Sequence, residues 1–211
     1  MTPTVTALTP LFAAEIGGVD VTRPLDPHLF AEIRAALDTH AVLVFRGQKL
    51  DDEAQIAFSR LFGPLETTVK ANPAGGTAFA RQSNIDLDTG EVIPPGDRRM
   101  VYQLANQLWH TDSSFKPVPS LCSLLSGREV PPEGGNTEFA DMRAAYDALD
   151  AAMKARIEGL VAEHSLVYSR SQVDPGVMTD DQKADVPPAR QALVRINPAT
   201  GRRSLFIGAH A

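Results

Sequence analysis

The pattern of hydrophobic and polar positions divides the chain into a helical first part and a second part of short apolar runs. Asp26 and Pro27 stand before apolar residues spaced three and four apart, which is typical of a capped helix and predicts a helix over Pro27–His40. The apolar run 41–45 predicts a buried strand. A second helix is expected over residues 52–62, where a Gly-Pro pair ends the helical spacing.

The rest of the chain combines a long polar loop with short strand-like runs. Residues 69–99 are rich in Gly, Pro, Asn and Asp, and a loop of this length in a compact domain is usually functional or mobile. One helical stretch, 144–160, interrupts the strands, and the turn 198–201 joins two of them as a hairpin. The predicted strands are residues 100–104, 108–112, 121–129, 137–140, 164–168, 193–196 and 204–207.

This order of elements predicts an α+β protein built around a jelly-roll or barrel core with flanking helices. With 211 residues the chain is expected to form a single domain, residues 1-211. Its last residues directly follow an apolar strand, and an unpaired apolar edge promotes aggregation. We therefore expect the sequence to be the N-terminal part of a longer protein, with the core incomplete in this chain.

Composition and charge narrow the class of protein. Twenty Lys and Arg against 26 Asp and Glu give a net charge of -6, so non-specific binding to nucleic acid has no electrostatic support. No run approaches the roughly 20 apolar residues that a membrane helix needs. The one cysteine, Cys122, cannot form a disulfide within the chain and is interpreted as a small buried hydrophobe. We expect a cytoplasmic protein without nucleic-acid or membrane partners, and the sequence leaves a homo-oligomer open.

The candidate chemistry begins at His110 and Asp112. Residues i and i+2 of a strand project to the same face, so on the predicted strand 108–112 both side chains can bind one metal ion. An imidazole and a carboxylate are two of the three ligands in the 2-His-1-carboxylate triad of non-haem Fe(II). The pattern H-x-D is short and frequent by chance, and a hydrogen-bonded surface histidine is the alternative interpretation.

A second candidate is Thr137, which follows the Gly134-Gly135 turn. The turn predicts a hairpin, and an ordinary hairpin explains these residues without any ligand. The functional alternative places the Thr137 hydroxyl on a carboxylate of a ligand. Spacing alone does not choose between the two.

Together these segments resemble the taurine/phenoxyacetate dioxygenase family of Fe(II)- and 2-oxoglutarate-dependent oxygenases. The resemblance spans essentially the whole chain and is closest to members that oxidise 2,4-dichlorophenoxyacetate. The strings that carry it are Pro10-Leu11-Phe12-Ala13-Ala14, Val42-Leu43-Val44-Phe45-Arg46-Gly47-Gln48, Leu61-Phe62-Gly63-Pro64-Leu65-Glu66, Ala105-Asn106-Gln107-Leu108-Trp109-His110-Thr111-Asp112, Gly134-Gly135-Asn136-Thr137-Glu138-Phe139, Asp141-Met142-Arg143-Ala144-Ala145-Tyr146-Asp147-Ala148-Leu149 and Leu205-Phe206-Ile207-Gly208-Ala209-His210-Ala211.

The resemblance implies a double-stranded β-helix core, Fe(II) as the cofactor, and 2-oxoglutarate and O2 as cosubstrates. It implies that His110 and Asp112 are iron ligands and that Thr137 holds the distal carboxylate of 2-oxoglutarate. Asn106 matches an asparagine that lines the substrate and cosubstrate pocket. The third iron ligand, a histidine, and the arginine that pairs with 2-oxoglutarate would lie downstream of these 211 residues.

The resemblance also implies a small anionic substrate. Lys70 and His210 fall where the phenoxyacetate-oxidising members have residues implicated in substrate binding, and Asn197 stands in place of a second substrate-site histidine. Lys70 and His210 each have a structural alternative, because a lysine in a polar loop is commonly solvated and a histidine can cap a strand end. Asn197 can donate a hydrogen bond but carries no charge.

The implied reaction hydroxylates the carbon next to the ether oxygen of phenoxyacetate-type herbicides and yields a phenol, glyoxylate, succinate and CO2. Two alternatives stay open: the same chemistry on a sulfonate, a sulfate ester or another carboxylate, and a non-catalytic member of the family. A zinc hydrolase is disfavoured, because catalytic zinc takes three protein ligands and the sequence has no H-E-x-x-H motif.

Overall fold

The first helix shows how local sequence sets the structure. In a computed structural model, which describes residues 2–70, 72, 75–86 and 88–211, α1 spans Pro27–His40 as predicted. The Asp26 carboxylate accepts a hydrogen bond from the backbone N–H of His28 (2.9 Å), and Pro27 occupies the first turn. The helix ends at Ala41, whose φ of 64° is outside the right-handed helical region.

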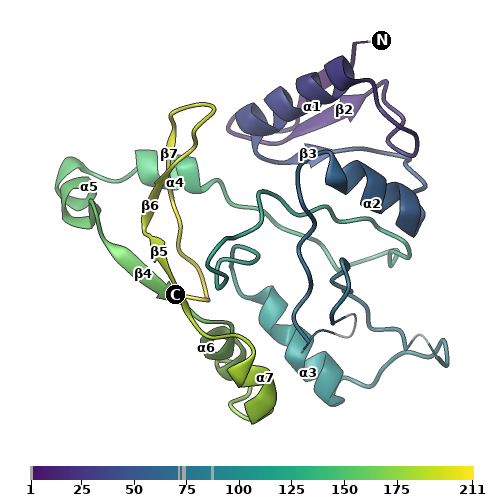
Figure 1. Cartoon of the computed structure of the whole chain (residues 1–211), viewed down its shortest axis with the longest axis vertical. Coiled ribbons are helices and arrows are strands. Elements are labelled where there is room, and N and C mark those ends of the chain that lie inside the picture. The colour runs from purple at the N-terminus through teal and green to yellow at the C-terminus, as the bar shows by residue number, and fades with distance from the viewer. Residues whose placement is uncertain (1, 71, 73–74, 87) are drawn as a thin grey trace. The chain divides into compact units, whose positions relative to one another are not determined.

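The chain contains both helices and short strands, in runs of one kind or the other (Figure 1). The strands are β1 (Thr4–Ala7), β2 (Ala14–Gly17), β3 (Leu43–Val44), β4 (Val161–His164), β5 (Ala189–Ala192), β6 (Val194–Ile196) and β7 (Arg203–Leu205). The helices are α1, α2 (Asp52–Arg60), α3 (Arg98–Leu104), the 3-10 helix η1 (Ala105–Gln107), α4 (Met142–Asp147), α5 (Ala151–Ile157), α6 (Leu166–Ser171) and α7 (Asp180–Ala184). Among these helices, none has both the length and the hydropathy of a membrane-spanning segment.

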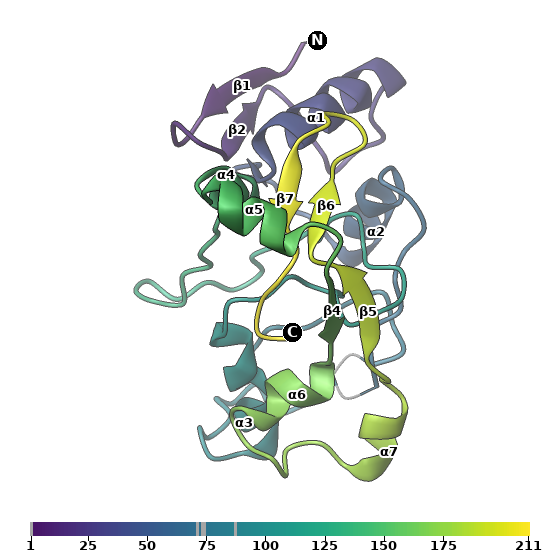
Figure 2. The same cartoon turned by 90° about the vertical axis from the view of Figure 1, so that its left-hand side faces the viewer.

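The strands form three small sheets within the described part of the chain. In the first, β2 pairs antiparallel with β1 and parallel with β3. In the second, β4 and β5 are antiparallel, with His164 opposite Ala189 (Figure 2). The third is the predicted hairpin of β6 and β7 around the turn 198–201. The fold therefore mixes helices with small sheets, as predicted, and its described strands do not close a barrel.

Several predicted elements are wrong, two of them because a side chain caps a helix there. Residues 100–104 belong to α3, because the Asp97 carboxylate caps a helix there by accepting from the backbone N–H of Arg99 (2.8 Å). Ser165 caps α6 in the same way, so the predicted strand 164–168 is the last residue of β4 followed by a helix. The predicted strands that are irregular in the structure are 108–112, 121–129 and 137–140, and the predicted helix 144–160 is replaced by α4 and α5.

Chain contacts divide the molecule into two compact units. Unit 1 comprises Met1–Pro64, Cys122–Arg156 and Arg195–Leu205, and unit 2 comprises Leu65–Leu121, Ile157–Val194 and Phe206–Ala211. Each unit buries its own apolar cluster, which supplies the main driving force for folding. The buried cluster of unit 1 is Ile16, Val19, Val21, Ile33, Ala36 and Phe58. That of unit 2 is Tyr102, Leu166, Val177, Met178 and Val186.

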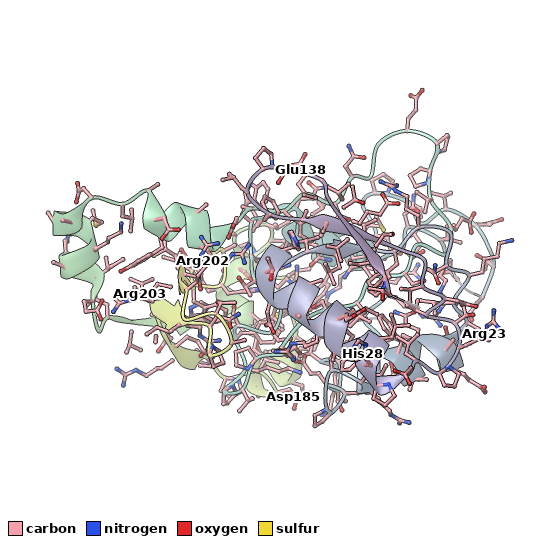
Figure 3. All side chains as sticks on the ribbon, turned by 90° about the horizontal axis from the view of Figure 1, so that it is seen from above. Arg23, His28, Glu138, Asp185, Arg202 and Arg203 are labelled. Carbon is pink, nitrogen blue, oxygen red and sulfur yellow. The ribbon has the colours of Figure 1, made fainter. Side chains whose placement is uncertain are left out.

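The β6–β7 hairpin is fixed to α4 within unit 1 by two consecutive arginines (Figure 3). Arg202 donates to the Asp147 carboxylate (2.8 Å), and Arg203 donates to the Tyr146 hydroxyl (3.2 Å). These contacts, together with the packing of α4 against β7, hold the hairpin and helix as one piece of unit 1.

A buried ion pair joins α4 to the end of α1. Arg143 donates to the Asp141 carboxylate (2.9 Å) and to the carbonyl of Thr39 (2.9 Å), and both charged side chains are less than one-tenth exposed. Burial by itself would raise the pKa of Asp141, but the hydrogen bonds from Arg143 outweigh it and lower the pKa below the usual 3.8. The carboxylate is therefore charged in the folded protein at neutral pH.

The substitution Asp141→Asn is expected to lower the free energy of unfolding by about 3 kcal/mol near neutral pH, because it leaves the buried guanidinium without its counter-ion. Since the pKa of Asp141 is depressed, the ion pair stabilises the fold above the ordinary carboxyl pKa of 3.8 and is lost as the pH falls through the folded-state pKa. Urea unfolding should show the difference between wild type and variant shrinking toward acid pH.

Asp52→Asn is the matched control, since Asp52 pairs with Arg128 (2.9 Å) on the surface of the same unit. We expect this variant to lose less than about 1 kcal/mol. An Asp141→Asn effect that is as small as that of the control, or that does not change with pH, would contradict the assigned role of the ion pair.

Candidate metal site and its pocket residues

His110 and Asp112 lie in contact within unit 2. Nε2 of His110 is 3.2 Å from Oδ1 of Asp112, and Nδ1 of the same ring is 2.6 Å from the carbonyl oxygen of Leu108. Because a carbonyl only accepts hydrogen bonds, Nδ1 carries a hydrogen, and Nε2 is the nitrogen that faces the carboxylate. The hydrogen bond to Asp112 raises the pKa of His110, although burial opposes this effect.

This donor pair fits two positions of the predicted iron site. A metal-binding histidine usually has its second ring nitrogen fixed by a carbonyl or carboxylate, as Leu108 fixes that of His110. The Asp112 side chain is 59% exposed, so a metal ion can reach its oxygens. Among the residues that the structure describes, no group of three or more His, Cys, Asp or Glu side chains is arranged to hold a metal ion. The described residues thus bring together two of the three predicted iron ligands.

The contact forms without the strand predicted over residues 108–112. After η1, Leu108 is extended, and the carbonyl of Trp109 accepts a hydrogen bond from the backbone N–H of Ala209 (2.8 Å). This bond joins the segment to residues 206–211, but the segment forms no strand in the structure. The chain then turns at Ser113, whose φ of 58° lies in the left-handed region and costs an L-residue about 1–2 kcal/mol. The two donors therefore meet beside a turn, and not by projecting from the same face of a strand as predicted.

Asn106, which is predicted to line the pocket, has hydrogen bonds on both polar atoms of its side-chain amide. Its Nδ2 donates to Oε1 of Gln82 (2.6 Å), and its Oδ1 accepts from the guanidinium of Arg170 (2.8 Å). Arg170 is buried, donates to the carbonyl of Tyr102 (3.2 Å) and stacks on the ring of that residue, 4.4 Å from its centroid. In the described part of the chain, its buried Nε has no hydrogen-bond partner. This positive charge, surrounded by neutral acceptors, favours an anion nearby.

His210 is buried beside His110. The two rings meet edge to face with centroids 5.4 Å apart, and the ring of Phe115 lies 5.1 Å from His210. Burial lowers the pKa of His210 to about 4, and the positive charges of His110 and Arg170 add to this effect, so the ring is neutral near pH 7. His210 also borders a surface hollow of about 330 Å³, whose other lining residues are Glu163, Ser165, Tyr168 and Ala211.

Ser169 fixes the tautomer of His210. Its Oγ lies 2.8 Å from Nδ1 of His210 and donates its own hydrogen to the carbonyl of Leu166 (2.9 Å). The hydroxyl has one hydrogen to give, so it accepts from an N–H at Nδ1. The lone pair of the neutral imidazole is therefore on Nε2.

Helix α6 holds both Asn106 and His210, because its consecutive residues Ser169 and Arg170 contact them. The backbone N–H of Ser165 also donates to the carbonyl of His210 (2.6 Å). The sequence analysis misses Ser169 and Arg170 because it predicts a strand over residues 164–168 and no helix after it. Ser165 as a helix N-cap is the signal that could have indicated α6.

Lys70 is exposed and paired within unit 2. Its Nζ lies 2.8 Å from a carboxylate oxygen of Asp185 (labelled in Figure 3), and the hydrogen bond to Asp185 raises the pKa of Lys70. A substrate carboxylate would therefore compete with Asp185 for this ammonium group. The role of Lys70 in substrate binding stays a prediction.

Thr137 and Asn197 belong to unit 1. Thr137 is exposed on an irregular segment, where a strand was expected. Oδ1 of Asn197 accepts from the backbone N–H groups of Ala199 (2.8 Å) and Thr200 (3.2 Å), which makes it a turn residue of the β6–β7 hairpin. Their roles beside a metal site in unit 2 stay predictions.

The family comparison decides the class of protein. The sequence model described as "Taurine catabolism dioxygenase TauD, TfdA family" matches residues 4–211. The chain belongs to this family. The prediction made from the sequence motifs is thereby confirmed.

Two curated relatives and one solved structure are similar over nearly the whole chain. The alpha-ketoglutarate-dependent 2,4-dichlorophenoxyacetate dioxygenase of Cupriavidus pinatubonensis is 44% identical over 209 residues, which are 97% of this chain and 72% of that protein. The (S)-phenoxypropionate/alpha-ketoglutarate-dioxygenase of Sphingobium herbicidovorans is 41% identical, over 95% of this chain and 68% of that protein. The crystal structure of AAD-2 in complex with Mn(II) and N-oxalylglycine matches with a TM-score of 0.89 and 44% identity, over 99% of this chain and 73% of that chain.

The substitution Ser169→Ala is expected to release the hydrogen from Nδ1 of His210, because the accepting oxygen is removed. The ¹⁵N chemical shifts of the imidazole should then report a larger share of the Nε2–H tautomer than in the wild type. Ser171→Ala is the matched control, since Ser171 donates to the carbonyl of Tyr168 (2.7 Å) on the same helix. A wild-type His210 that already carries its hydrogen on Nε2 would contradict the assignment.

Proposed function

We propose that this protein is an Fe(II)- and 2-oxoglutarate-dependent dioxygenase that hydroxylates the carbon next to the ether oxygen of phenoxyacetate-type substrates. The observation that carries the proposal is the 3.2 Å contact between Nε2 of His110 and Oδ1 of Asp112. It occurs in a chain that is 44% identical to a 2,4-dichlorophenoxyacetate dioxygenase. The products of this reaction are a phenol, glyoxylate, succinate and CO2.

His110 and Asp112 would hold the iron through Nε2 and a carboxylate oxygen. When bound, Fe(II) together with 2-oxoglutarate and O2 supplies the oxidising chemistry that attacks the C–H bond. The chain's contribution is to fix both donors: Leu108 orients the imidazole, and the turn after Asp112 orients the carboxylate. The three-ligand triad that the sequence predicts would leave other positions of the ion open to oxygen ligands.

The net charge of the chain is -6, so an anionic ligand needs positive charge close to the site. Arg170 places a buried positive charge against Asn106, which we propose contacts both the cosubstrate and the substrate. Thr137 is proposed to hold the distal carboxylate of 2-oxoglutarate. Lys70 and Asn197 are proposed to bind the substrate, and Lys70 is the one of the two that offers charge.

His210 is proposed to contact the substrate without charge. Its pKa of about 4 keeps the imidazole neutral near pH 7, and its ring packs against His110 and Phe115. In this position the ring orients the substrate by its shape and keeps water away from His110.

We further propose that units 1 and 2 belong to one oxygenase domain with a double-stranded β-helix core. The family match across residues 4–211 supports this, because it covers segments of both units. The TM-score of 0.89 to AAD-2 over 99% of the chain gives further support.

Titration of the 211-residue protein with Mn(II), followed by the loss of the free-ion EPR signal, tests the metal site. We expect His110→Ala and Asp112→Asn each to raise the dissociation constant at least about 10-fold, because each removes one of two protein ligands. His28→Ala is the control, since His28 is an exposed histidine on α1 in the other unit. Equal Mn(II) affinity of wild type and His110→Ala would contradict the proposal.

Turnover with Fe(II), 2-oxoglutarate and O2 tests the substrate. We expect phenol release from 2,4-dichlorophenoxyacetate to exceed product formation from taurine or an alkyl sulfate. Preference for taurine or the sulfate would establish the same chemistry on another substrate. Intact metal binding with no turnover of any of the three would instead support a non-catalytic member of the family.

A further inference from the structure

Asp112 stands at the start of a turn, residues 112–116, which buried polar groups hold in place. Ser113 has a φ of 58°, and the backbone N–H of Lys116 donates to its carbonyl (2.9 Å). Ser113 and Ser114 are both buried. A residue with a side chain keeps a left-handed conformation only when its surroundings determine it. The neighbours of this turn therefore decide where the Asp112 carboxylate lies.

Glu66 contacts this turn through both of its oxygens. Oε1 accepts from the hydroxyl of Ser113 (2.9 Å) and pairs with the ammonium group of Lys116 (2.6 Å), and Oε2 accepts from the hydroxyl of Ser120. Lys116 also donates to the carbonyl of Thr67 (2.8 Å), next to Glu66 in sequence. One carboxylate thus connects Ser113, which adjoins Asp112, to the end of the same turn.

The β4–β5 sheet holds the other side of the turn. Oγ of Ser114 lies 3.0 Å from Nδ1 of His164, and Nε2 of Gln191 donates to the carbonyls of Ser114 (3.0 Å) and Lys116 (2.7 Å). His164 and Gln191 are buried on β4 and β5. These contacts fix residues 114–116, whereas the contact from Glu66 reaches Ser113 itself.

We propose that Glu66 is a positioning residue for the metal: it fixes Ser113 in its left-handed conformation and so holds the Asp112 carboxylate at Nε2 of His110. The inference rests on the proposed function, because it concerns the same metal site. It also gives a role to the motif Leu61-Phe62-Gly63-Pro64-Leu65-Glu66, whose last residue is otherwise unexplained by the site. Glutamine at this position keeps one acceptor oxygen and loses the charge that pairs with Lys116.

Mn(II) titration of the full 211-residue chain, with EPR detection, tests this role in Glu66→Gln, Glu66→Ala and Ser113→Ala. We expect each variant to bind Mn(II) about 10-fold more weakly than the wild type, as is usual when a residue that supports a metal ligand is lost. Circular dichroism and the Tm of each variant report whether the fold is kept. Glu66→Gln and Ser113→Ala keep the test decisive if Glu66→Ala fails to fold.

Asp86→Asn is the matched control. Asp86 lies in the same unit, pairs with Arg99 (2.7 Å) and accepts from the backbone N–H of Asp88 (2.9 Å), so it too combines an ion pair with a turn contact. We expect this variant to lower the Tm as much as Glu66→Gln does while leaving the Mn(II) affinity within about 2-fold of wild type. Equal losses of Mn(II) affinity in both variants would reduce Glu66 to a merely structural role.

A double-mutant cycle separates action through Asp112 from any other effect on the metal. We expect Glu66→Gln to weaken Mn(II) binding in the wild-type background and to have no further effect in the Asp112→Asn background. Wild-type affinity in Glu66→Gln, or a full additional loss in the Asp112→Asn background, would overturn the proposal. Mn(II) binding that does not respond to His110→Ala would contradict the proposed function itself, and the role of Glu66 with it.

Discussion

The contact between Nε2 of His110 and Oδ1 of Asp112 is the interaction on which the site depends. Two protein donors bind a metal ion usefully only if they are held facing each other before the ion arrives, since ordering them on binding would cost conformational entropy. The carbonyl of Leu108 fixes the imidazole, and a turn with Ser113 at positive φ follows the carboxylate. The strain at Ser113 is tolerated because the surrounding polar contacts outweigh it.

Unit 2 supplies a frame of buried polar groups around this contact. In helix α6, Ser169 contacts His210, and Arg170 contacts Asn106. In the β4–β5 sheet, His164 and Gln191 contact the turn after Asp112. Hydrogen bonds of this kind hold side chains in one arrangement, because a buried polar group that loses its partner is costly. These buried groups also determine which side chains near the contact are charged. Arg170 is positive and lies among neutral acceptors, whereas His210 is neutral.

The sequence predicts what depends on neighbours along the chain. Asp26, Pro27 and the helical spacing give α1 with its observed bounds, and the 198–201 turn gives the β6–β7 hairpin. Strands over 108–112 and 137–140 are wrong, because an apolar run becomes a strand only where a ladder of backbone hydrogen bonds pairs it. Residues 100–104 form a helix, because the cap at Asp97 outweighs their apolar character.

The candidate site likewise has one part that the sequence predicts and another part that it does not. The motif His110-Thr111-Asp112 and the family resemblance indicate two candidate metal ligands, and the structure places these two side chains in contact. The contacts of Glu66, Ser169 and Arg170 with the site could not be predicted, because they span 47, 41 and 64 positions of sequence. Such pairings follow from tertiary packing, which no local pattern reports.

The most direct measurement of the central claim is pulsed EPR of the Mn(II)-loaded chain, in which nitrogen of a coordinated imidazole modulates the electron spin echo. Binding through Nε2 of His110 predicts modulation from one imidazole, its loss in His110→Ala, and its persistence in His28→Ala. Bound Mn(II) without any imidazole modulation, or modulation unchanged in His110→Ala, would contradict the account.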